Sequence, residues 1–150
     1  MTTFPKFRST AGGAVVETEV GPAPEDSTVI LLVEDEPSVR GLFATSLLRH
    51  GYCVLEARNG AEGLEAAERA GRLDLVVSDV VMPVMKGPQL CEKLRETRPD
   101  LRVLFVSGYL VDEQLGPNAE IMQKPFRPDQ LIRKIKDLIG PAKVPQAAAS

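Results

Sequence analysis

Short apolar runs alternate with stretches of helical periodicity through most of this chain. The runs expected to form buried strands are residues 28–33, 52–57, 73–78, 102–106 and 120–123. Between them, apolar residues recur every three or four positions, which predicts amphipathic helices near residues 37–50, 60–70, 88–98 and 128–139. Strands that alternate with helices in this way favour a parallel sheet with helices on both faces.

Local sequence signals support the ends of these helices. Pro37 suits a first helical turn, and Gly51 suits the residue just after a helix. Asn59 followed by Glu62 is similar to a capping box. One expected helix is weak, because Gly116-Pro117 interrupts the segment that would contain it, so a helix around residues 111–115 is predicted to be short or irregular.

The two ends of the chain lack sustained periodicity. Residues 1–26 contain Gly12-Gly13 and Gly21-Pro22, which favours a flexible leader. Residues 141–150 are expected to form a loose tail. We therefore predict one folded domain over residues 27–140, which suits a chain of 150 residues.

Composition excludes several classes of function. The net charge of −3 and the pI of about 5.3 provide no basic footprint for nucleic acid. The longest apolar runs, about five residues, are far shorter than the ~20 needed to span a bilayer, and the N-terminus lacks a secretory signal.

Cys53 and Cys91 lie within apolar periodic stretches and are expected to be buried free thiols, which indicates a reducing compartment, the cytoplasm.

Polar residues follow four of the predicted strands. They are Glu34 and Asp35 after the first strand, Asp79 after the third, Ser107 after the fourth and Lys124 after the fifth. Because the carboxyl ends of parallel strands open into one crevice, we expect these side chains to meet there. Carboxylate oxygens with room for water suit Mg²⁺, and a lysine can pair with a phosphate.

Each of these residues alone also fits a simpler interpretation. The acids fit a solvated loop, Ser107 a strand-end cap and Lys124 a surface lysine. Their joint placement, each just past a strand, favours phosphate and metal chemistry on a carboxylate.

Four stretches of the sequence resemble the receiver domain of bacterial response regulators. They are Val33-Glu34-Asp35-Glu36-Pro37, Asp79-Val80-Val81-Met82-Pro83-Val84-Met85-Lys86-Gly87, Ser107-Gly108-Tyr109 and Lys124-Pro125-Phe126. They occur in the family's order, and the resemblance covers about residues 28–140. It implies a flavodoxin-like, doubly wound, five-stranded parallel sheet with strand order 2-1-3-4-5.

The resemblance also implies roles for individual residues. Asp79 matches the phospho-accepting aspartate. Glu34 and Asp35 match the acidic pair that binds Mg²⁺, and Val81 matches the position whose backbone carbonyl also binds the metal. Ser107 matches the hydroxyl that turns toward the phosphoryl group. Lys124 matches the lysine that pairs with a phosphoryl oxygen, with a cis bond to Pro125.

The phosphoryl donor implied by the resemblance is a phosphohistidine on a histidine kinase or on a histidine phosphotransfer protein. The chain departs from the family at Ile121, where an aromatic residue often reports phosphorylation. We hypothesise that Tyr109, or its loop, carries that change here.

Several functions remain open at this point. The chain suits a stand-alone receiver, the receiver piece of a hybrid histidine kinase, or a docking module that keeps only the fold. No DNA-binding segment is expected after residue 140. A dinucleotide enzyme is disfavoured, because no Gly-x-Gly-x-x-Gly follows the first strand. We expect a phosphoacceptor rather than an enzyme, with at most self-phosphorylation and dephosphorylation.

Overall fold

One mixed sheet runs through the centre of the computed structural model, which describes residues 4–11, 14–23, 26–82, 84–108, 116 and 118–143. Within those residues, seven strands form the sheet in the order β2-β1-β4-β3-β5-β6-β7. Their bounds are β1 (Lys6–Ala11), β2 (Ala14–Glu19), β3 (Val29–Val33), β4 (Cys53–Ala57), β5 (Leu75–Asp79), β6 (Val103–Ser107) and β7 (Ala119–Gln123).

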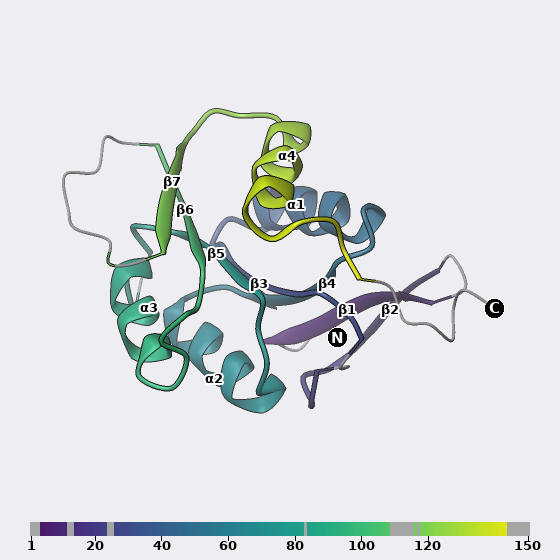
Figure 1. Cartoon of the computed structure of the whole chain (residues 1–150), viewed down its shortest axis with the longest axis horizontal. Helices are drawn as coiled ribbons and strands as arrows, with labels where there is room; N and C mark the ends of the chain where they lie inside the picture. The colour runs from purple at the N-terminus through teal and green to yellow at the C-terminus, as the bar shows by residue number, and fades with distance from the viewer. Residues whose placement is uncertain are drawn as a thin grey trace.

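Helices cover both faces of the sheet. In the described part of the chain they are α1 (Pro37–Arg49), α2 (Gly60–Ala70), α3 (Gly87–Arg95) and α4 (Pro128–Ile139). The helices α1 and α4 lie on one face, and α2 and α3 lie on the other (Figure 1). None of these helices combines the length and the apolar composition required to cross a membrane.

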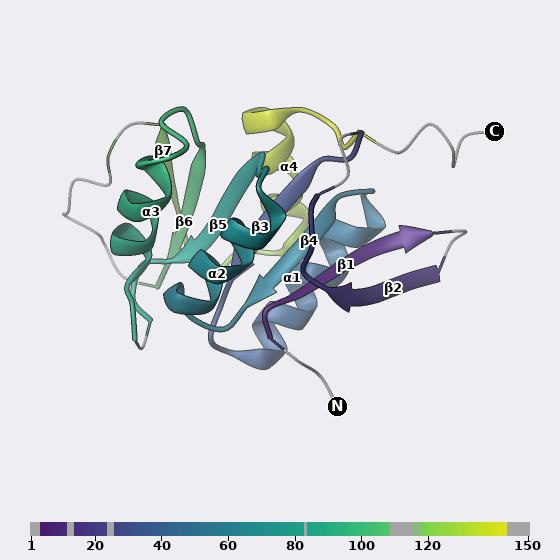
Figure 2. The same ribbon diagram turned by 90° about the horizontal axis from the view of Figure 1, so that it is seen from below.

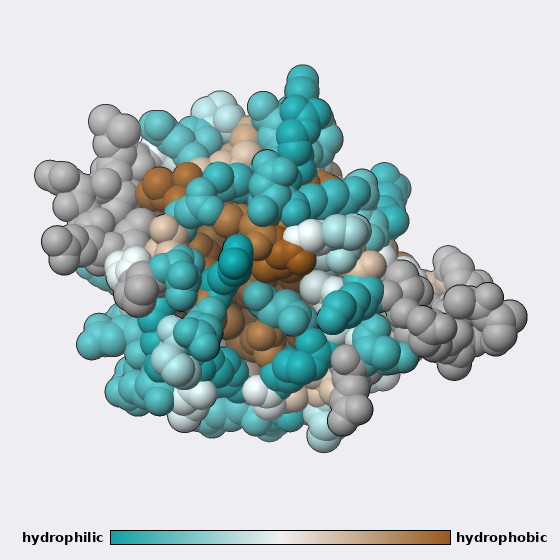
Figure 3. Space-filling model, viewed as in Figure 1, coloured by the Kyte–Doolittle hydropathy of each residue, from teal (hydrophilic) through white to brown (hydrophobic). Residues whose placement is uncertain are grey.

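Five of the strands, from β4 to β7 across the sheet, are parallel. Counted along the chain, they stand in the order 2-1-3-4-5, as the resemblance implied. Every residue of β3 is buried, because Leu31 packs in the core beneath α2 and α3 while Ile30 and Leu32 pack beneath α1 and α4. Figure 3 shows hydrophobic surface between the two helical layers, surrounded by hydrophilic residues.

The local signals of the sequence act as predicted. Pro37 is the first residue of α1, and Gly51 follows its end with a φ of 88°. The side chain of Asn59 accepts a 2.9 Å hydrogen bond from the Glu62 amide and so caps α2. One large apolar residue of α1, Leu42, is 53% exposed and does not join the core.

The prediction of a flexible leader over residues 1–26 is wrong for residues 6–11 and 14–19. These residues form the antiparallel hairpin β1–β2, and β1 pairs antiparallel with the edge of β4 (Figure 2). The sheet therefore has seven strands in the described residues, two more than the five expected. The physical reason is non-local: the residues of β4 that pair with β1 lie 46 to 50 residues further along the chain (Val54 less Arg8, Glu56 less Lys6). Periodicity within the segment cannot reveal such a partner.

The expected tail over residues 141–150 is ordered at its start. The Lys143 amide donates a 2.8 Å hydrogen bond to the Thr28 hydroxyl, and the Lys143 carbonyl accepts one from the Thr28 amide at 3.4 Å. Residues 144–150 lie outside the described residues. So do Tyr109 and the segment 111–115, which were predicted to hold the phosphorylation response and a short helix.

Candidate functional site

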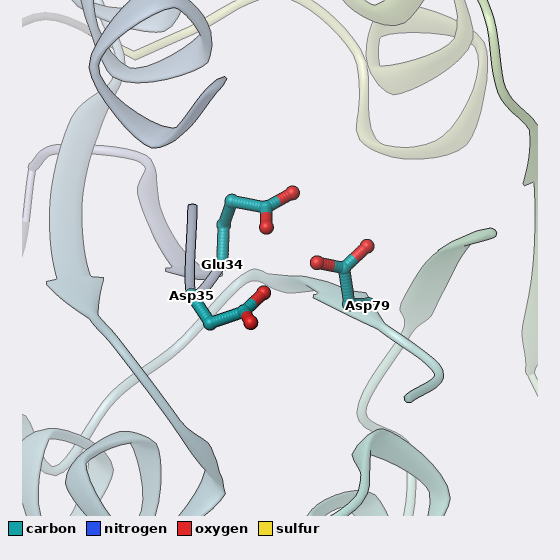
Figure 4. Close-up of side chains that lie close together, drawn as sticks. All are labelled: Glu34, Asp35 and Asp79. Carbon is teal, nitrogen blue, oxygen red and sulfur yellow. The ribbon is translucent and has the colours of Figure 1, made fainter. Parts of the chain in front are cut away.

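The carboxyl ends of the parallel strands bring the predicted site residues together. Glu34 and Asp35 follow β3, Asp79 ends β5, Ser107 ends β6 and Lys124 follows β7. Figure 4 shows the side chains of Glu34, Asp35 and Asp79 converging on one space between the ends of β3 and β5. Each offers a carboxylate oxygen, and these oxygens all lie within 4.8 Å of one another.

Lys124 joins two of these acids. Its Nζ lies 2.9 Å from Asp79 Oδ1 and 3.0 Å from Glu34 Oε1. Its amide donates a 2.7 Å hydrogen bond to the Ser107 carbonyl, and its peptide bond to Pro125 is cis, as the resemblance implied. Burial alone would lower the pKa of Lys124, but the hydrogen bonds to Asp79 and Glu34 outweigh burial and raise it. The ammonium is therefore charged at neutral pH.

Glu34 is the most deeply buried of the three acids, with 2% of its surface exposed. Its Oε2 accepts a 3.1 Å hydrogen bond from the Glu36 amide, and its main-chain carbonyl accepts one of 2.9 Å from Arg40 Nη1. Burial, followed by the close approach of Asp79, raises the pKa of the Glu34 carboxyl. Both the side chain and the main chain of Glu34 are thus held in place.

Asp35 lies at the solvent side of the same cluster. Its side chain is exposed, whereas Glu34 and Asp79 are buried. Partial desolvation, followed by the neighbouring Glu34 carboxylate, raises the pKa of Asp35. The cluster therefore has one acid that a ligand can approach from water and two that are covered by protein.

A cavity of about 350 Å³ opens beside these acids. Its lining includes Val81, Ser107 and Gly108 in addition to the acids and Lys124. Ser107 is buried, and Val81 is 64% exposed. The cavity has room for a hydrated cation and a small anionic group next to Asp79.

Two glycines allow the segment after Asp79 to turn back against the sheet. A Cβ on Gly87 would lie 2.1 Å from the Asp79 carbonyl oxygen, and one on Gly60 would lie 2.7 Å from Met85 Cβ. The Gly87 amide also donates a 3.0 Å hydrogen bond to the Val80 carbonyl. The start of α3 therefore rests directly on the main chain of Asp79, which holds this residue at the sheet edge.

The charge balance of the cluster favours a divalent cation. Three carboxylates face one ammonium, which leaves an excess of two negative charges when all are ionised. Two like charges about 4 Å apart repel by about 4 kcal/mol at an effective dielectric constant of 20. Oxygen-only ligands and space for water suit Mg²⁺, so the residues present fit that ion.

Sequence reasoning did not predict the role of Arg40. This side chain is 6% exposed, although arginine is rarely buried unless it is paired. A signal was present in the sequence, because Arg40 lies between Val39 and the Phe43-Ala44 pair on the buried side of α1. An arginine within an apolar helix face indicates a specific partner inside the protein.

A larger cavity, of about 700 Å³, lies near the amino ends of the parallel strands, away from the acids. Its arginines already have partners in the fold. Arg98 donates to the Ala67 and Gly71 carbonyls at 2.8 Å, and Arg102 donates to the Leu138 carbonyl. These carbonyls end α2 and α4, where cations are favourable and a bound anion is not. We therefore assign the functional site to the smaller, acidic cavity.

Comparison with known proteins places most of the chain in one group. Residues 30–136 match the response regulator receiver domain family. The sensor kinase CckA of Brucella abortus is 44% identical in an alignment of 119 positions that covers 75% of this chain and 13% of that kinase. The response regulator receiver protein CpdR of the same organism is 30% identical, over 73% of this chain and 95% of its own length. The chain thus spans a small part of one relative and nearly all of the other.

Solved structures agree with these sequence matches. The receiver domain of the hybrid histidine kinase CckA has a TM-score of 0.67 and 39% identity, over 74% of this chain and 98% of that one. The response regulator TrrA of Thermotoga maritima, solved in complex with Mg²⁺ and BeF, has a TM-score of 0.67 and 31% identity, over 74% and 98% of the two chains. Each similarity covers about three quarters of this chain.

Proposed function

The chain belongs to the response regulator receiver domain family, and on that premise we propose that Asp79 accepts a phosphoryl group from a phosphohistidine. Receiver domains act in two-component signalling, where they interact with histidine kinases or phosphotransfer proteins.

The observation that carries the proposal is the position of Lys124. Its Nζ bridges Asp79 and Glu34, on the side of the acids that opens into the cavity. A structural ion pair needs only one acid, whereas a phosphoryl group bound to Asp79 needs a cation beside the new negative charge. A lysine shared by two acids can move onto that charge without leaving the site.

The metal site follows from the same cluster. Glu34, Asp35 and Asp79 would supply carboxylate oxygens to Mg²⁺, and Val81 would supply its main-chain carbonyl. When bound, the ion neutralises the acids and the oxygens of the incoming phosphoryl group. All of these donors are oxygen atoms, which are the ligands that Mg²⁺ prefers.

The transfer step is a displacement at phosphorus. An Asp79 Oδ atom attacks in line, the new O–P bond forms, and the N–P bond of the phosphohistidine breaks. The electron pair of that bond leaves with the imidazole, which takes up a proton. Lys124 Nζ then pairs with a phosphoryl oxygen, and the Ser107 hydroxyl donates to another.

A direct test uses the full chain, acetyl phosphate and Mg²⁺, with intact-mass spectrometry as the measurement. We expect one phosphoryl adduct, which disappears on chelation of Mg²⁺ and in Asp79→Asn. The control variant is Asp100→Asn, which removes an exposed acid away from the cluster and should keep the adduct. Absence of the adduct in the wild type, or its persistence in Asp79→Asn, would refute the proposal.

A receiver within a hybrid histidine kinase is a second context for the same chemistry. The 44% identity to the sensor kinase CckA favours it. Phosphotransfer in both directions with a purified histidine phosphotransfer domain supports this context, and one-way transfer from a kinase alone counts against it. A docking module without phosphorylation is the remaining alternative, and a negative result in the acetyl phosphate test would favour it.

We propose that the chain is a phosphoacceptor with at most self-phosphorylation and dephosphorylation, which fits a nucleophile consumed in each transfer. We also propose a cytoplasmic location, in line with the two buried free thiols, Cys53 and Cys91. Fractionation of expressing cells, with the chain in the cytoplasmic fraction, is the expected result.

A further inference from the structure

The β1–β2 hairpin lies outside the part of the chain that matches the receiver family, which begins at residue 30. It nevertheless covers the outer edge of β4, so that β4 is an interior strand of the sheet. In the register of this pairing, Lys6 lies opposite Glu56 and Arg8 lies opposite Val54. The hairpin thus brings two cations to a buried acid of β4.

Glu56 joins the hairpin to α1. One of its oxygens, Oε2, lies 2.9 Å from Arg8 Nε, and the other, Oε1, lies 3.6 Å from Arg40 Nε. The contact with Arg8 is an ion pair by distance, without the angle of a good hydrogen bond. Glu56 is 2% exposed, so its charge depends on these neighbours.

Arg40 carries the connection to the acidic cluster. Its Nη1 donates a buried 2.9 Å hydrogen bond to the carbonyl of Glu34, one of the three clustered acids. The same guanidinium stacks against the hairpin side, with its Cζ 4.5 Å from the centre of the Phe4 ring. The Arg40 guanidinium therefore contacts Glu56 and Phe4 and also binds the main-chain carbonyl of Glu34.

Two further cations lie close to the Phe4 ring. Lys6 Nζ and the Arg58 guanidinium each lie 4.7 Å from its ring centre. Cation–π contacts are stronger when they are shielded from water, and Lys6 and Arg40 are both buried. Without the hairpin, Glu56 would lie on an open edge strand, where water would compete for its charge and for that of the neighbouring Arg40.

We propose that the β1–β2 hairpin, acting through Glu56, positions Arg40 so that it fixes the Glu34 main chain and thereby raises the Mg²⁺ affinity of the acidic cluster. This inference rests on the proposed function, because it concerns the metal site of the phosphorylation reaction. Arg40 is a positioning residue in this scheme. The hairpin precedes the region that matches the receiver family, and in this scheme it adjusts the metal affinity of a site within that region.

We expect the main chain of Glu34 to become less ordered when the contacts from Arg8 through Glu56 to Arg40 are broken. With Arg8 neutralised, Glu56 Oε2 loses the cation that lies 2.9 Å away, and Arg40 is drawn toward Glu56 and away from the Glu34 carbonyl. A net hydrogen bond of ordinary strength corresponds to a factor of about three to ten in an equilibrium constant. Loss of a group that orients a metal ligand typically costs about tenfold or more in metal affinity.

The test titrates ¹⁵N-labelled full-length chain with Mg²⁺ alone and follows the Glu36 amide, which donates to Glu34 Oε2. We expect Arg8→Gln to weaken Mg²⁺ binding about threefold and Arg40→Lys to weaken it about tenfold. The matched control is Arg69→Gln, which removes an equal charge from an exposed pair with Glu65 on α2 and should bind as the wild type does. Arg8→Lys, which keeps the charge, should restore most of the affinity.

Salt separates positioning from long-range charge effects. In 1 M KCl the Debye length is about 3 Å, so a change in affinity that survives there is local. Circular dichroism before each titration ensures that only folded protein is compared. Wild-type affinity in Arg8→Gln, or a loss that vanishes in 1 M KCl, would overturn the inference, even if that variant unfolds at a lower temperature.

A second measurement distinguishes this inference from the proposed function. The Glu34 amide donates a 3.1 Å hydrogen bond to the Ala57 carbonyl, so its hydrogen exchange reports how firmly this main chain is held. Faster exchange in Arg8→Gln than in Arg69→Gln supports positioning, and equal exchange refutes it. If the wild type shows no Mg²⁺ response or phosphoryl adduct, the proposed function fails, while this exchange measurement still decides whether the hairpin positions Glu34.

Discussion

Replacing Gly87 by alanine adds a methyl group where the structure leaves no room. A Cβ at this first residue of α3 would lie 2.1 Å from the Asp79 carbonyl oxygen, 3.0 Å from Ser78 Oγ and 3.1 Å from Phe105 Cε1. Ordinary contact begins at 3.4 Å, so the methyl group and the Asp79 oxygen must separate by a further 1.3 Å (3.4 less 2.1). A backbone oxygen at the end of β5 cannot rotate away as a side chain can.

The expected cost follows from two opposing effects. Overpacking a filled site typically costs about 1–3 kcal/mol of unfolding free energy, and this contact is at the severe end. Alanine is favoured over glycine in a helix by up to about 1 kcal/mol. We therefore expect Gly87→Ala to lower the unfolding free energy by about 2 kcal/mol. The control is Gly41→Ala within α1, where nothing lies within 4 Å and a gain of about 0.5–1 kcal/mol is expected.

Urea and thermal denaturation measure both variants, because a single domain of this size usually unfolds in one step. A loss of about 2 kcal/mol corresponds to a Tm lower by about 4–8 °C. The same displacement moves Asp79, so the rate of adduct formation with acetyl phosphate should also fall. If Gly87→Ala unfolds at or above the wild-type temperature while Gly41→Ala behaves as expected, the argument from close packing is wrong.

Three further predictions follow from other parts of the structure. The pKa values of Glu34 and Asp35 are raised in the folded state, so the folded state binds a proton at each carboxyl more tightly than the unfolded state does. Without Mg²⁺, the unfolding free energy should therefore fall as the pH rises from the ordinary carboxyl pKa range through the raised pKa values. Glu34→Gln should flatten that slope in urea titrations, and an unchanged slope would contradict the assignment. Asn59→Ala removes the α2 cap and should cost about 1 kcal/mol in urea denaturation, a result that a wild-type midpoint would exclude. Burial raises the pKa of Cys91 to about 12, so iodoacetamide at pH 8 should label it only after unfolding, as peptide mass spectrometry would reveal.

The parallel part of the fold could be predicted from the sequence because its signals are local. Pro37, Gly51 and Asn59 act within a few residues of their own positions, and the buried strands are continuous apolar runs. The site residues were also predictable, since parallel strands place their carboxyl ends at one edge. The ion pairs that link Lys124 to Asp79 and Glu34 follow from that topology together with side-chain reach.

The β1–β2 hairpin could not be predicted from local sequence signals. In the sequence, Gly12-Gly13 lies between the two segments that form β1 and β2, and Ala11 pairs with Ala14. A two-residue glycine connection is a known hairpin signal, yet the same glycines also suit a flexible leader. Lys6, Arg8 and Glu17 supply charge rather than an apolar face, so hydrophobic patterning alone favoured the wrong interpretation.

By itself, the amino-acid order determined which segments become helices or parallel strands and which acids, hydroxyl and lysine end those strands. Both properties depend on neighbours within a few positions and on the regular geometry of parallel sheets. Only the tertiary structure decided that Glu56 and Arg40 would be buried next to the hairpin, with Arg40 bound to the carbonyl of Glu34. Buried charges are stable only when their partners arrive from distant parts of the chain, and those partners exist only once the chain has folded.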